Sequence, residues 1–234
     1  MTTPRAPGAP HAARAPHAPR AIIFDLDGTL VDTVGTRVHS WMAVFPRFGI
    51  QPEPEFLAPL MGSDGKLLAR MVAEHYGVAL QPGDDAQIDI EAGLEFRVLN
   101  AQPRALPAAR DILESLTDQG LPWAVATSSL PDDARESVQS LGLRAMPLIC
   151  DGADVEHAKP APDLLLKAAG LLHVEPETAW YVGDSRWDML ASRAAGMRAI
   201  AVLTGATAEA ELRETGADAI YPTLREFMAD IPAS

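Results

Sequence analysis

Short apolar runs alternate with longer amphipathic stretches along most of this 234-residue chain. Each apolar run is bounded by glycine, proline or polar residues. Runs this short and this apolar are typical of strands in a parallel sheet that is covered on both faces. The predicted strands are 21–24, 122–126, 147–150, 178–182 and 199–203.

Helical patterns lie between the predicted strands. They cover 107–119, 132–141, 162–171 and 185–195. Gly120, Gly142 and Gly196 stand where such helices need a left-handed residue in order to end. Because strand and helix alternate, we predict an α/β fold, with a Rossmann-like parallel sheet core and helices on both faces.

The interval between Val34 and Arg104 breaks this alternation, because it contains no convincing buried strand. It holds helical patterns instead, at 36–48, 64–76 and 84–100, joined by segments rich in proline and glycine. An all-helical block inserted after the first strand predicts a lid over the carboxyl edge of the sheet. We therefore expect a core of residues 21–34 and 105–234 and an inserted helical cap domain of residues 35–104.

The first twenty residues differ from the rest in composition. They contain five prolines, six alanines and three arginines, and no acidic residue. They lack the continuous apolar core of a secretory signal, and the prolines oppose the amphipathic helix of a transit peptide. We expect residues 1–20 to form a flexible Pro/Ala-rich tail.

Composition and charge narrow the classes of function. The formal net charge is −13, and so acidic a surface repels nucleic acid, which we expect not to be a partner. No apolar run is long enough to cross a bilayer, so we expect no membrane association. Cys150 is the only cysteine, which excludes an internal disulfide or a cysteine-built zinc site and fits a reducing cytoplasm. The pattern indicates no particular oligomeric state.

The most informative stretch follows the first predicted strand and reads Asp25-Leu26-Asp27-Gly28-Thr29. Two aspartates at i and i+2 of an extended backbone project to the same side, so their carboxylates converge. Like charges held this close repel each other, and a bound cation is the usual remedy. Gly28 supplies a sharp turn. A calcium loop would need further oxygen ligands and a closing glutamate, which are missing here.

Three further polar motifs follow in order. Thr127 and Ser128 end the next strand, Lys159 precedes a helix, and Asp184 and Asp188 follow a third strand in a Gly-Asp-x-x-x-Asp pattern. Each motif is weak alone, because a lone threonine or lysine is usually structural. Four motifs in this order, each at the carboxyl end of a strand, argue strongly against a purely structural role for all of them.

In these four motifs the chain resembles the haloacid dehalogenase superfamily of phosphotransferases, from residue 21 to about residue 221. Within it, the resemblance is to the phosphoglycolate phosphatases and β-phosphoglucomutases, which carry an α-helical cap. The resemblance implies that Asp25 is the nucleophile that attacks phosphorus and forms an aspartyl-phosphate. It also implies that Asp27 protonates the leaving oxygen and then deprotonates the hydrolytic water.

The same resemblance implies a Mg²⁺ site made of the Asp25 and Asp184 carboxylates, the backbone carbonyl of Asp27, phosphate and water. Asp188 is expected to hold the motif lysine or a metal-bound water rather than to bind the metal directly.

Two further roles follow from the resemblance. Thr127 would donate a hydrogen bond to a phosphoryl oxygen, with Ser128 as a supporting donor. Lys159 would offset the negative charge shared by Asp25 and the phosphoryl group.

The implied function is Mg²⁺-dependent hydrolysis of a small phosphorylated metabolite. A sugar phosphomutase of the β-phosphoglucomutase type shares all four motifs and differs in what the cap admits as phosphoryl acceptor, so it stays open. A 2-haloacid dehalogenase needs no acid for a leaving alcohol and lacks the second aspartate, so Asp27 counts against it. A non-catalytic binding module is disfavoured because every acid, the lysine and the hydroxyl are in place.

A segment of the predicted cap is the candidate for substrate selection. Gly62 and Gly65 suggest a loop that leads into a helix, whose first amides would be free to bind an anion. Lys66 and Arg70 are spaced i, i+4, so both side chains project from one face of that helix. We expect them to contact the part of the substrate that is not phosphate. A solvated basic pair is the competing interpretation.

Overall fold

The computed structural model describes residues 18–232. Most of the predicted N-terminal tail, residues 1–17, lies outside the described residues. The sheet of the described chain has the strand order β3-β2-β1-β4-β5-β6, and every pair of neighbours is parallel. The strands are β1 (Ala21–Phe24), β2 (Trp123–Ala126), β3 (Ile149–Cys150), β4 (Ala179–Gly183), β5 (Arg198–Val202) and β6 (Ala219–Tyr221). The predicted α/β fold is confirmed.

Strand β1 lies in the middle of the sheet, and all four of its residues are buried. It pairs with β2 on one side and β4 on the other, so that Ile22 lies opposite Trp123 and Trp180. A central strand can be apolar on both faces only because helices cover both faces. The strand order reverses between β1 and β4, and in open α/β sheets ligands bind at the carboxyl ends of the strands beside this point.

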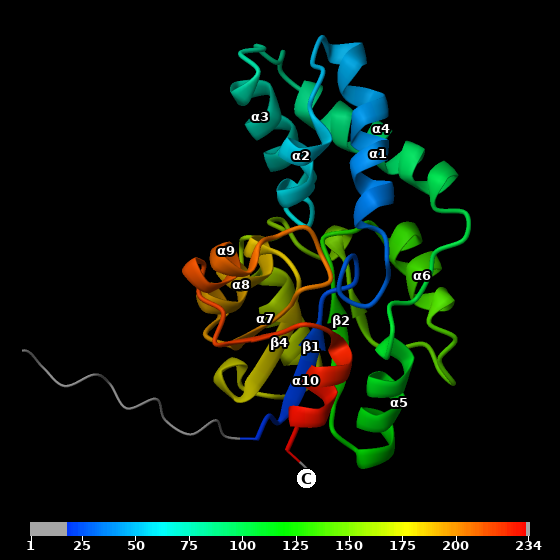
Figure 1. Cartoon of the computed structure of the whole chain (residues 1–234), viewed down its shortest axis with the longest axis vertical. Coiled ribbons are helices and arrows are strands. Elements are labelled where there is room, and N and C mark those ends of the chain that lie inside the picture. The colour runs from blue at the N-terminus through cyan, green and yellow to red at the C-terminus, as the bar shows by residue number, and fades with distance from the viewer. Residues whose placement is uncertain (1–17, 233–234) are drawn as a thin grey trace, which may run out of the picture.

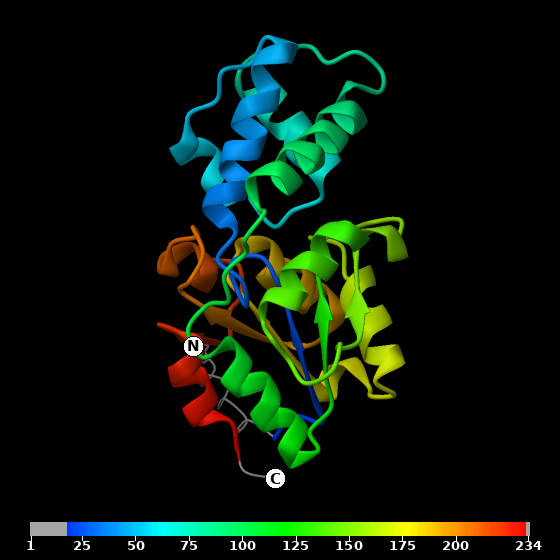
Figure 2. The same cartoon turned by 90° about the vertical axis from the view of Figure 1, so that its right-hand side faces the viewer.

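Helices cover both faces of the sheet (Figure 2). One face carries α5 (Ala109–Gln119), α6 (Pro131–Ser140) and α10 (Leu224–Asp230). The opposite face carries α7 (Asp163–Leu171), α8 (Arg186–Ala195) and α9 (Glu209–Glu214). The residues that follow α5, α6 and α8, at or next to the helix end, are Gly120, Gly142 and Gly196, with φ values of 69°, 62° and 73°. These left-handed helix ends were expected from the sequence and are confirmed.

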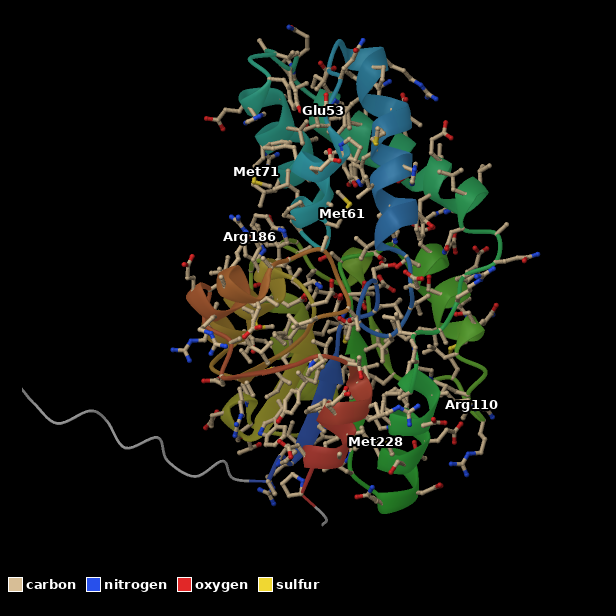
Figure 3. All side chains as sticks on the ribbon, in the orientation of Figure 1. Glu53, Met61, Met71, Arg110, Arg186 and Met228 are labelled. Carbon is tan, nitrogen blue, oxygen red and sulfur yellow. The ribbon has the colours of Figure 1, made fainter. Side chains whose placement is uncertain are left out.

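A separate group of helices, here called the cap, stands over the carboxyl edge of the sheet (Figure 1). It consists of α1 (Val34–Val44), α2 (Pro54–Leu57), α3 (Gly65–His75) and α4 (Asp84–Leu99), with 3-10 turns at Phe45–Phe48 and Ala58–Leu60. Its apolar side chains form their own cluster, which includes Trp187 from α8 of the core. Met61 lies at the end of the cap nearest the sheet (Figure 3).

The chain enters and leaves the cap at adjacent points. Val31 forms an isolated antiparallel bridge with Ala105. Next to this bridge the amide of Asp32 donates to the carbonyl of Arg104 at 2.8 Å. Two segments that lie side by side therefore connect the cap to the sheet.

Three short elements near the C-terminus were not predicted, namely α9, β6 and α10. The two helices have six and seven residues, too few for a helical period to stand out. Strand β6 has three half-buried residues at the edge of the sheet. Among the described helices, none is long and apolar enough to cross a membrane.

Candidate active site

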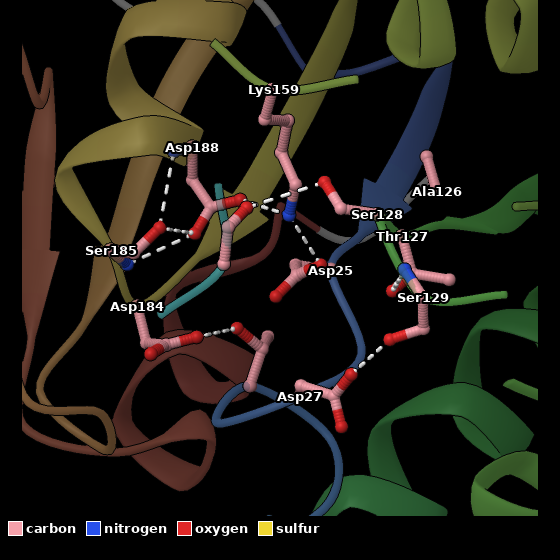
Figure 4. Close-up of polar contacts among 12 residues, drawn as sticks. Asp25, Asp27, Ala126, Thr127, Ser128, Ser129, Lys159, Asp184, Ser185 and Asp188 are labelled. Carbon is pink, nitrogen blue, oxygen red and sulfur yellow. Dashed lines mark hydrogen bonds and ion pairs between the residues drawn. The ribbon is translucent and has the colours of Figure 1, made fainter. Parts of the chain in front are cut away.

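The four motifs meet at the carboxyl edge of the sheet, beside the point where the strand order reverses (Figure 4). A cavity lies between this edge and the cap. Its lining includes Asp25, Asp27, Thr127, Ser128, Lys159 and Asp184. Strands β1, β2 and β4 thus bring together residues that are up to 159 positions apart in the chain. Asp188 and Gly28 contact this group from outside the lining.

Lys159 is fully buried between two carboxylates. Its Nζ donates to Oδ1 of Asp25 at 2.6 Å and to Oδ1 of Asp188 at 2.8 Å. Burial alone would lower the pKa of Lys159, but the charges of Asp188 and Asp25 raise it, so the ammonium is charged. Oδ2 of Asp188 accepts from the amide and hydroxyl of Ser185. Asp188 is thereby fixed as the partner that holds Lys159 against Asp25.

Together, the carboxylates of Asp25, Asp184 and Asp188 carry more negative charge than the single ammonium of Lys159 can balance. Burial raises the pKa of Asp25 to about 7, although the charge of Lys159 acts to lower it. The charge of Asp188 adds to the rise. Burial also raises the pKa of Asp184 well above its usual value, with further contributions from Asp188 and Asp25. Such an arrangement favours the binding of a cation.

Carboxylate oxygens of Asp25, Asp184 and Asp188 lie within 4.8 Å of one another. Both oxygens of Asp188 are already engaged by hydrogen bonds. Asp25 and Asp184, by contrast, each use only one oxygen in side-chain hydrogen bonds to the described residues. Hard oxygen donors suit Mg²⁺, so these two carboxylates are the best placed to hold it.

Gly28 allows the turn after Asp27 to pack against Asp184. Its φ is +85°, and a Cβ at this position would come within 2.5 Å of Oδ2 of Asp184. The next residue, Thr29, donates its hydroxyl to Oδ1 of Asp184 at 2.7 Å. A larger residue at Gly28 would therefore displace a candidate metal ligand.

Asp27 is held by three side chains that the sequence did not single out. The hydroxyls of Thr33 and Ser129 donate to its two oxygens. Nη2 of Arg37 donates to Oδ2 at 3.1 Å and to Oγ of Ser129 at 2.7 Å. Burial alone would raise the pKa of Asp27, but the Arg37 charge and these hydrogen bonds hold it below its usual range. Asp27 is therefore ionised in this arrangement.

Arg37 belongs to the cap and joins it to the core. Its guanidinium carbon lies 3.4 Å from the centre of the Phe96 ring, in α4, and Nη1 lies 3.8 Å from Oδ2 of Asp133, in α6. Arg97 donates from Nε to the other oxygen of Asp133 at 2.7 Å. Asp133 is buried although it lies in the acidic first turn of α6. An aspartate in the first turn of a helix is usually solvated, so this contact could not be predicted from the sequence.

The hydroxyl residues after β2 lie at the cap boundary. Thr127 is buried, and its Oγ1 accepts from the amide of Ser129 at 3.1 Å. Ser128 donates to the carbonyl of Gly62 in the cap at 3.3 Å. The amide of Asp64 donates to the carbonyl of Lys159 at 2.8 Å. The loop before α3 therefore contacts the carboxyl edge of the sheet directly.

This loop lines the cavity through residues other than the two expected ones. Gly62, Ser63 and Gly65 belong to the lining. Lys66 and Arg70 are exposed and do not belong to it, and Arg70 forms an ion pair with Asp85 of α4. Contact of Lys66 and Arg70 with substrate remains a prediction.

The parallel sheet with reversed order, the carboxylate–lysine–carboxylate group and the inserted cap define an α/β enzyme with its site at the strand ends. The sequence matches the family described as haloacid dehalogenase-like hydrolase over residues 22–202. The chain belongs to this family of hydrolases.

Known relatives agree with this assignment. The chain is 33% identical over 182 residues to fructose-1-phosphate phosphatase YqaB of Escherichia coli, covering 77% of this chain and 95% of that protein. It is 29% identical over 216 residues to phosphoglycolate phosphatase 1 of Pseudomonas aeruginosa, covering 89% and 78%. The crystal structure of a hydrolase from Pseudomonas syringae matches with a TM-score of 0.85 at 29% identity, covering 90% of this chain and 97% of that one.

Proposed function

We propose that the protein is a Mg²⁺-dependent phosphatase that hydrolyses a small phosphomonoester through an aspartyl-phosphate on Asp25. The observation that carries this proposal is the buried contact between Lys159 and Asp25 in a cavity that also contains Thr127 and Ser128. Relatives named as fructose-1-phosphate and phosphoglycolate phosphatases support the phosphomonoester class.

The proposal gives the two parts of the chain different tasks. Residues 21–34 and 105–234 form the catalytic core, and residues 35–104 form a cap domain that encloses the substrate. The separate apolar cluster of the cap supports this division. The single cysteine, Cys150, supports a reducing compartment such as the cytoplasm.

In the first step, an oxygen of Asp25 forms a bond to phosphorus while the bond to the leaving oxygen breaks. Lys159 holds Oδ1 of Asp25 at 2.6 Å, which orients the carboxylate for attack. Thr127 donates to a phosphoryl oxygen. Mg²⁺ bound by Asp25 and Asp184 would neutralise charge on these carboxylates and on the phosphoryl group.

Asp27 serves both steps, first as the acid for the leaving oxygen and then as the base for water. The ionised Asp27 of this structure is ready for the second role. The first role requires a proton on Asp27, which Arg37 and Ser129 oppose. A substrate that takes over the hydrogen bonds of Arg37 would therefore promote protonation of Asp27.

The test of this function is phosphate release from a panel of phosphomonoesters with Mg²⁺, and again with EDTA. We expect Mg²⁺-dependent release from at least one small substrate. Absence of release from the whole panel would contradict the proposal. Conversion of a sugar 1-phosphate into its 6-phosphate without net phosphate release would favour the phosphomutase alternative.

Replacement of Asp184 should remove most of the thermal stabilisation by Mg²⁺. Millimolar Mg²⁺ is expected to raise the thermal midpoint of the wild type, since a ligand that binds the folded state stabilises it. Asp184→Asn should lose most of that Mg²⁺-dependent shift, as measured by differential scanning fluorimetry. Asp118→Asn is the control, because its carboxylate is 64% exposed and does not belong to the cavity lining. Equal shifts in the two variants would exclude Asp184 as a metal ligand.

Asp27→Asn is expected to slow hydrolysis of alkyl phosphates by about 10²- to 10⁴-fold, the range for loss of general acid–base catalysis. Aryl phosphates should lose less in the first step, because a phenolate leaves without protonation. The kcat/KM values with glycerol 3-phosphate and p-nitrophenyl phosphate measure the difference, because kcat/KM reports the steps up to formation of the aspartyl-phosphate. An unchanged rate with the alkyl substrate would remove Asp27 from the mechanism.

A further inference from the structure

One carboxylate enters the cavity from the cap rather than from the sheet. Asp89 of α4 belongs to the cavity lining together with Arg37, Ser63 and Gly65. Its position differs from that of Asp25, which follows β1 on the opposite side of the cavity. Within residues 18–232, Asp89 has neither an ion-pair partner nor a side-chain hydrogen bond, in contrast to every catalytic carboxylate described above.

The packing of α3 against α4 fixes this carboxylate. A Cβ at Gly65 would lie 1.8 Å from Oδ1 of Asp89 and 2.4 Å from its Cγ. Only glycine therefore lets the start of α3 approach Asp89 this closely. The carboxylate therefore lies against the backbone at the start of α3, and both Asp89 and Gly65 line the cavity.

No cation among the described residues pairs directly with Asp89. Burial raises its pKa to about 6, and the charge of Asp64 adds to the rise, while Lys66 and Arg37 oppose it. Lys66 is exposed, and Arg37 already contacts Asp27 and Asp133. At neutral pH, Asp89 is therefore an ionised acceptor that lines the cavity and has no side-chain partner among residues 18–232.

An acceptor of this kind distinguishes between substrates. A carboxylate accepts hydrogen bonds from hydroxyl groups. It repels a second carboxylate held in the same cavity, and specificity often depends on such a repulsive element. The wall that faces the phosphate site thus favours a leaving group with hydroxyls and without further negative charge.

We propose that Asp89 selects phosphomonoesters of neutral polyhydroxy compounds, sugars or polyols, and rejects carboxylated phosphomonoesters such as phosphoglycolate. Asp89 accepts hydrogen bonds from hydroxyls of the leaving group. This selection rests on the proposed phosphatase function and specifies its substrate class. This substrate class also differs from the one that a contact through Lys66 would favour, because a basic side chain would favour a leaving group that carries an anionic group.

The test compares two substrates of nearly equal size. Glycerol 3-phosphate and 3-phosphoglycerate differ in a hydroxymethyl group against a carboxylate. We expect the wild type to have the higher kcat/KM with glycerol 3-phosphate. Asp89→Asn should shift the ratio of the two kcat/KM values at least about tenfold toward 3-phosphoglycerate, mainly through a lower KM, equivalent to about 1.4 kcal/mol.

Asp85→Asn is the matched control, because Asp85 lies one turn earlier on α4 and pairs with Arg70 outside the cavity. The same change of charge there should leave the ratio within about twofold, since exposed pairs act weakly at a distance. An unchanged ratio in Asp89→Asn, with turnover of p-nitrophenyl phosphate retained, would overturn the role of Asp89 and leave the phosphatase function standing. If the wild type releases phosphate from no phosphomonoester, the proposed function itself fails.

Thermal stability gives a second readout. A raised carboxyl pKa means that the folded state binds the proton more tightly than the unfolded state, so stability falls as pH rises from about 4 to about 6. Asp64, Lys66, Arg37 and Asp133 are the charged groups near Asp89. Asp89→Asn should raise the thermal midpoint at pH 7 by a few degrees and by less at pH 4. A lowered midpoint at pH 7 would overturn the proposal, because Asp89 would then support packing.

Discussion

Asp25→Asn is expected to reduce phosphate release by at least about 10³-fold, as loss of a covalent nucleophile does. The amide has the shape of the carboxyl group but cannot form the acyl phosphate. The contact of Lys159 with Asp188, at 2.8 Å in the wild type, does not involve Asp25, so the thermal midpoint should change by no more than a few degrees. Steady-state kinetics and differential scanning fluorimetry on the same preparation measure both effects.

The intact mass of the protein provides an independent check. After a rapid acid quench with substrate and Mg²⁺, the wild type should contain a phosphorylated fraction that Asp25→Asn lacks. Turnover above about one per cent of the wild type in the purified variant would exclude Asp25 as the nucleophile.

Lys159→Met should lose both activity and stability. The substitution leaves Asp25 and Asp188 buried without their cation, and removal of one partner from a buried pair costs about 3–5 kcal/mol. Urea unfolding should show this loss at pH 7.5. The loss should be smaller at pH 5.5, because the unpaired carboxylates then take up protons. We expect activity to fall by at least about 10²-fold.

Lys167→Met is the control for Lys159→Met. Lys167 is also a lysine of an ion pair, with Asp154, but its side chain is 36% exposed. Its loss should change the free energy of unfolding by less than about 1 kcal/mol, as for other surface pairs. Equal losses in the free energy of unfolding for the two substitutions would mean that the buried ion pairs of Lys159 stabilise the fold no more than a surface ion pair does.

The sequence predicted the sheet well where strands are fully buried. Residues 21–24 and 179–183 form β1 and β4, and their apolar runs lie in the predicted stretches. Motif residues follow these strands directly, so the end of each run located a site residue. Strand β6 was missed because Ala219–Tyr221 is short and half-buried, and the edge position gives no continuous apolar signal.

Contacts between cap and core could not be predicted in the same way. Arg37 and Asp89 each lie on a cap helix, and a charged side chain on a helix is normally solvated. The proximity of Asp89 to Gly65 depends on how α4 packs against α3. The proximity of Arg37 to Asp27 depends on how the cap sits on the sheet. That placement arises from packing between segments far apart in sequence, such as Trp187 in the cap cluster, and no local pattern encodes it.

The paired segments at the base of the cap have an evolutionary consequence. Val31 and Ala105 are bridged, so the two ends of the intervening stretch are held together by the core itself. Insertions are tolerated where the ends to be joined already lie close. A descendant could therefore lengthen, trim or replace the whole stretch without shifting β1 or the aspartates behind it. New substrates would then be acquired by exchange of one contiguous piece of the gene, while the phosphoryl chemistry is inherited unchanged.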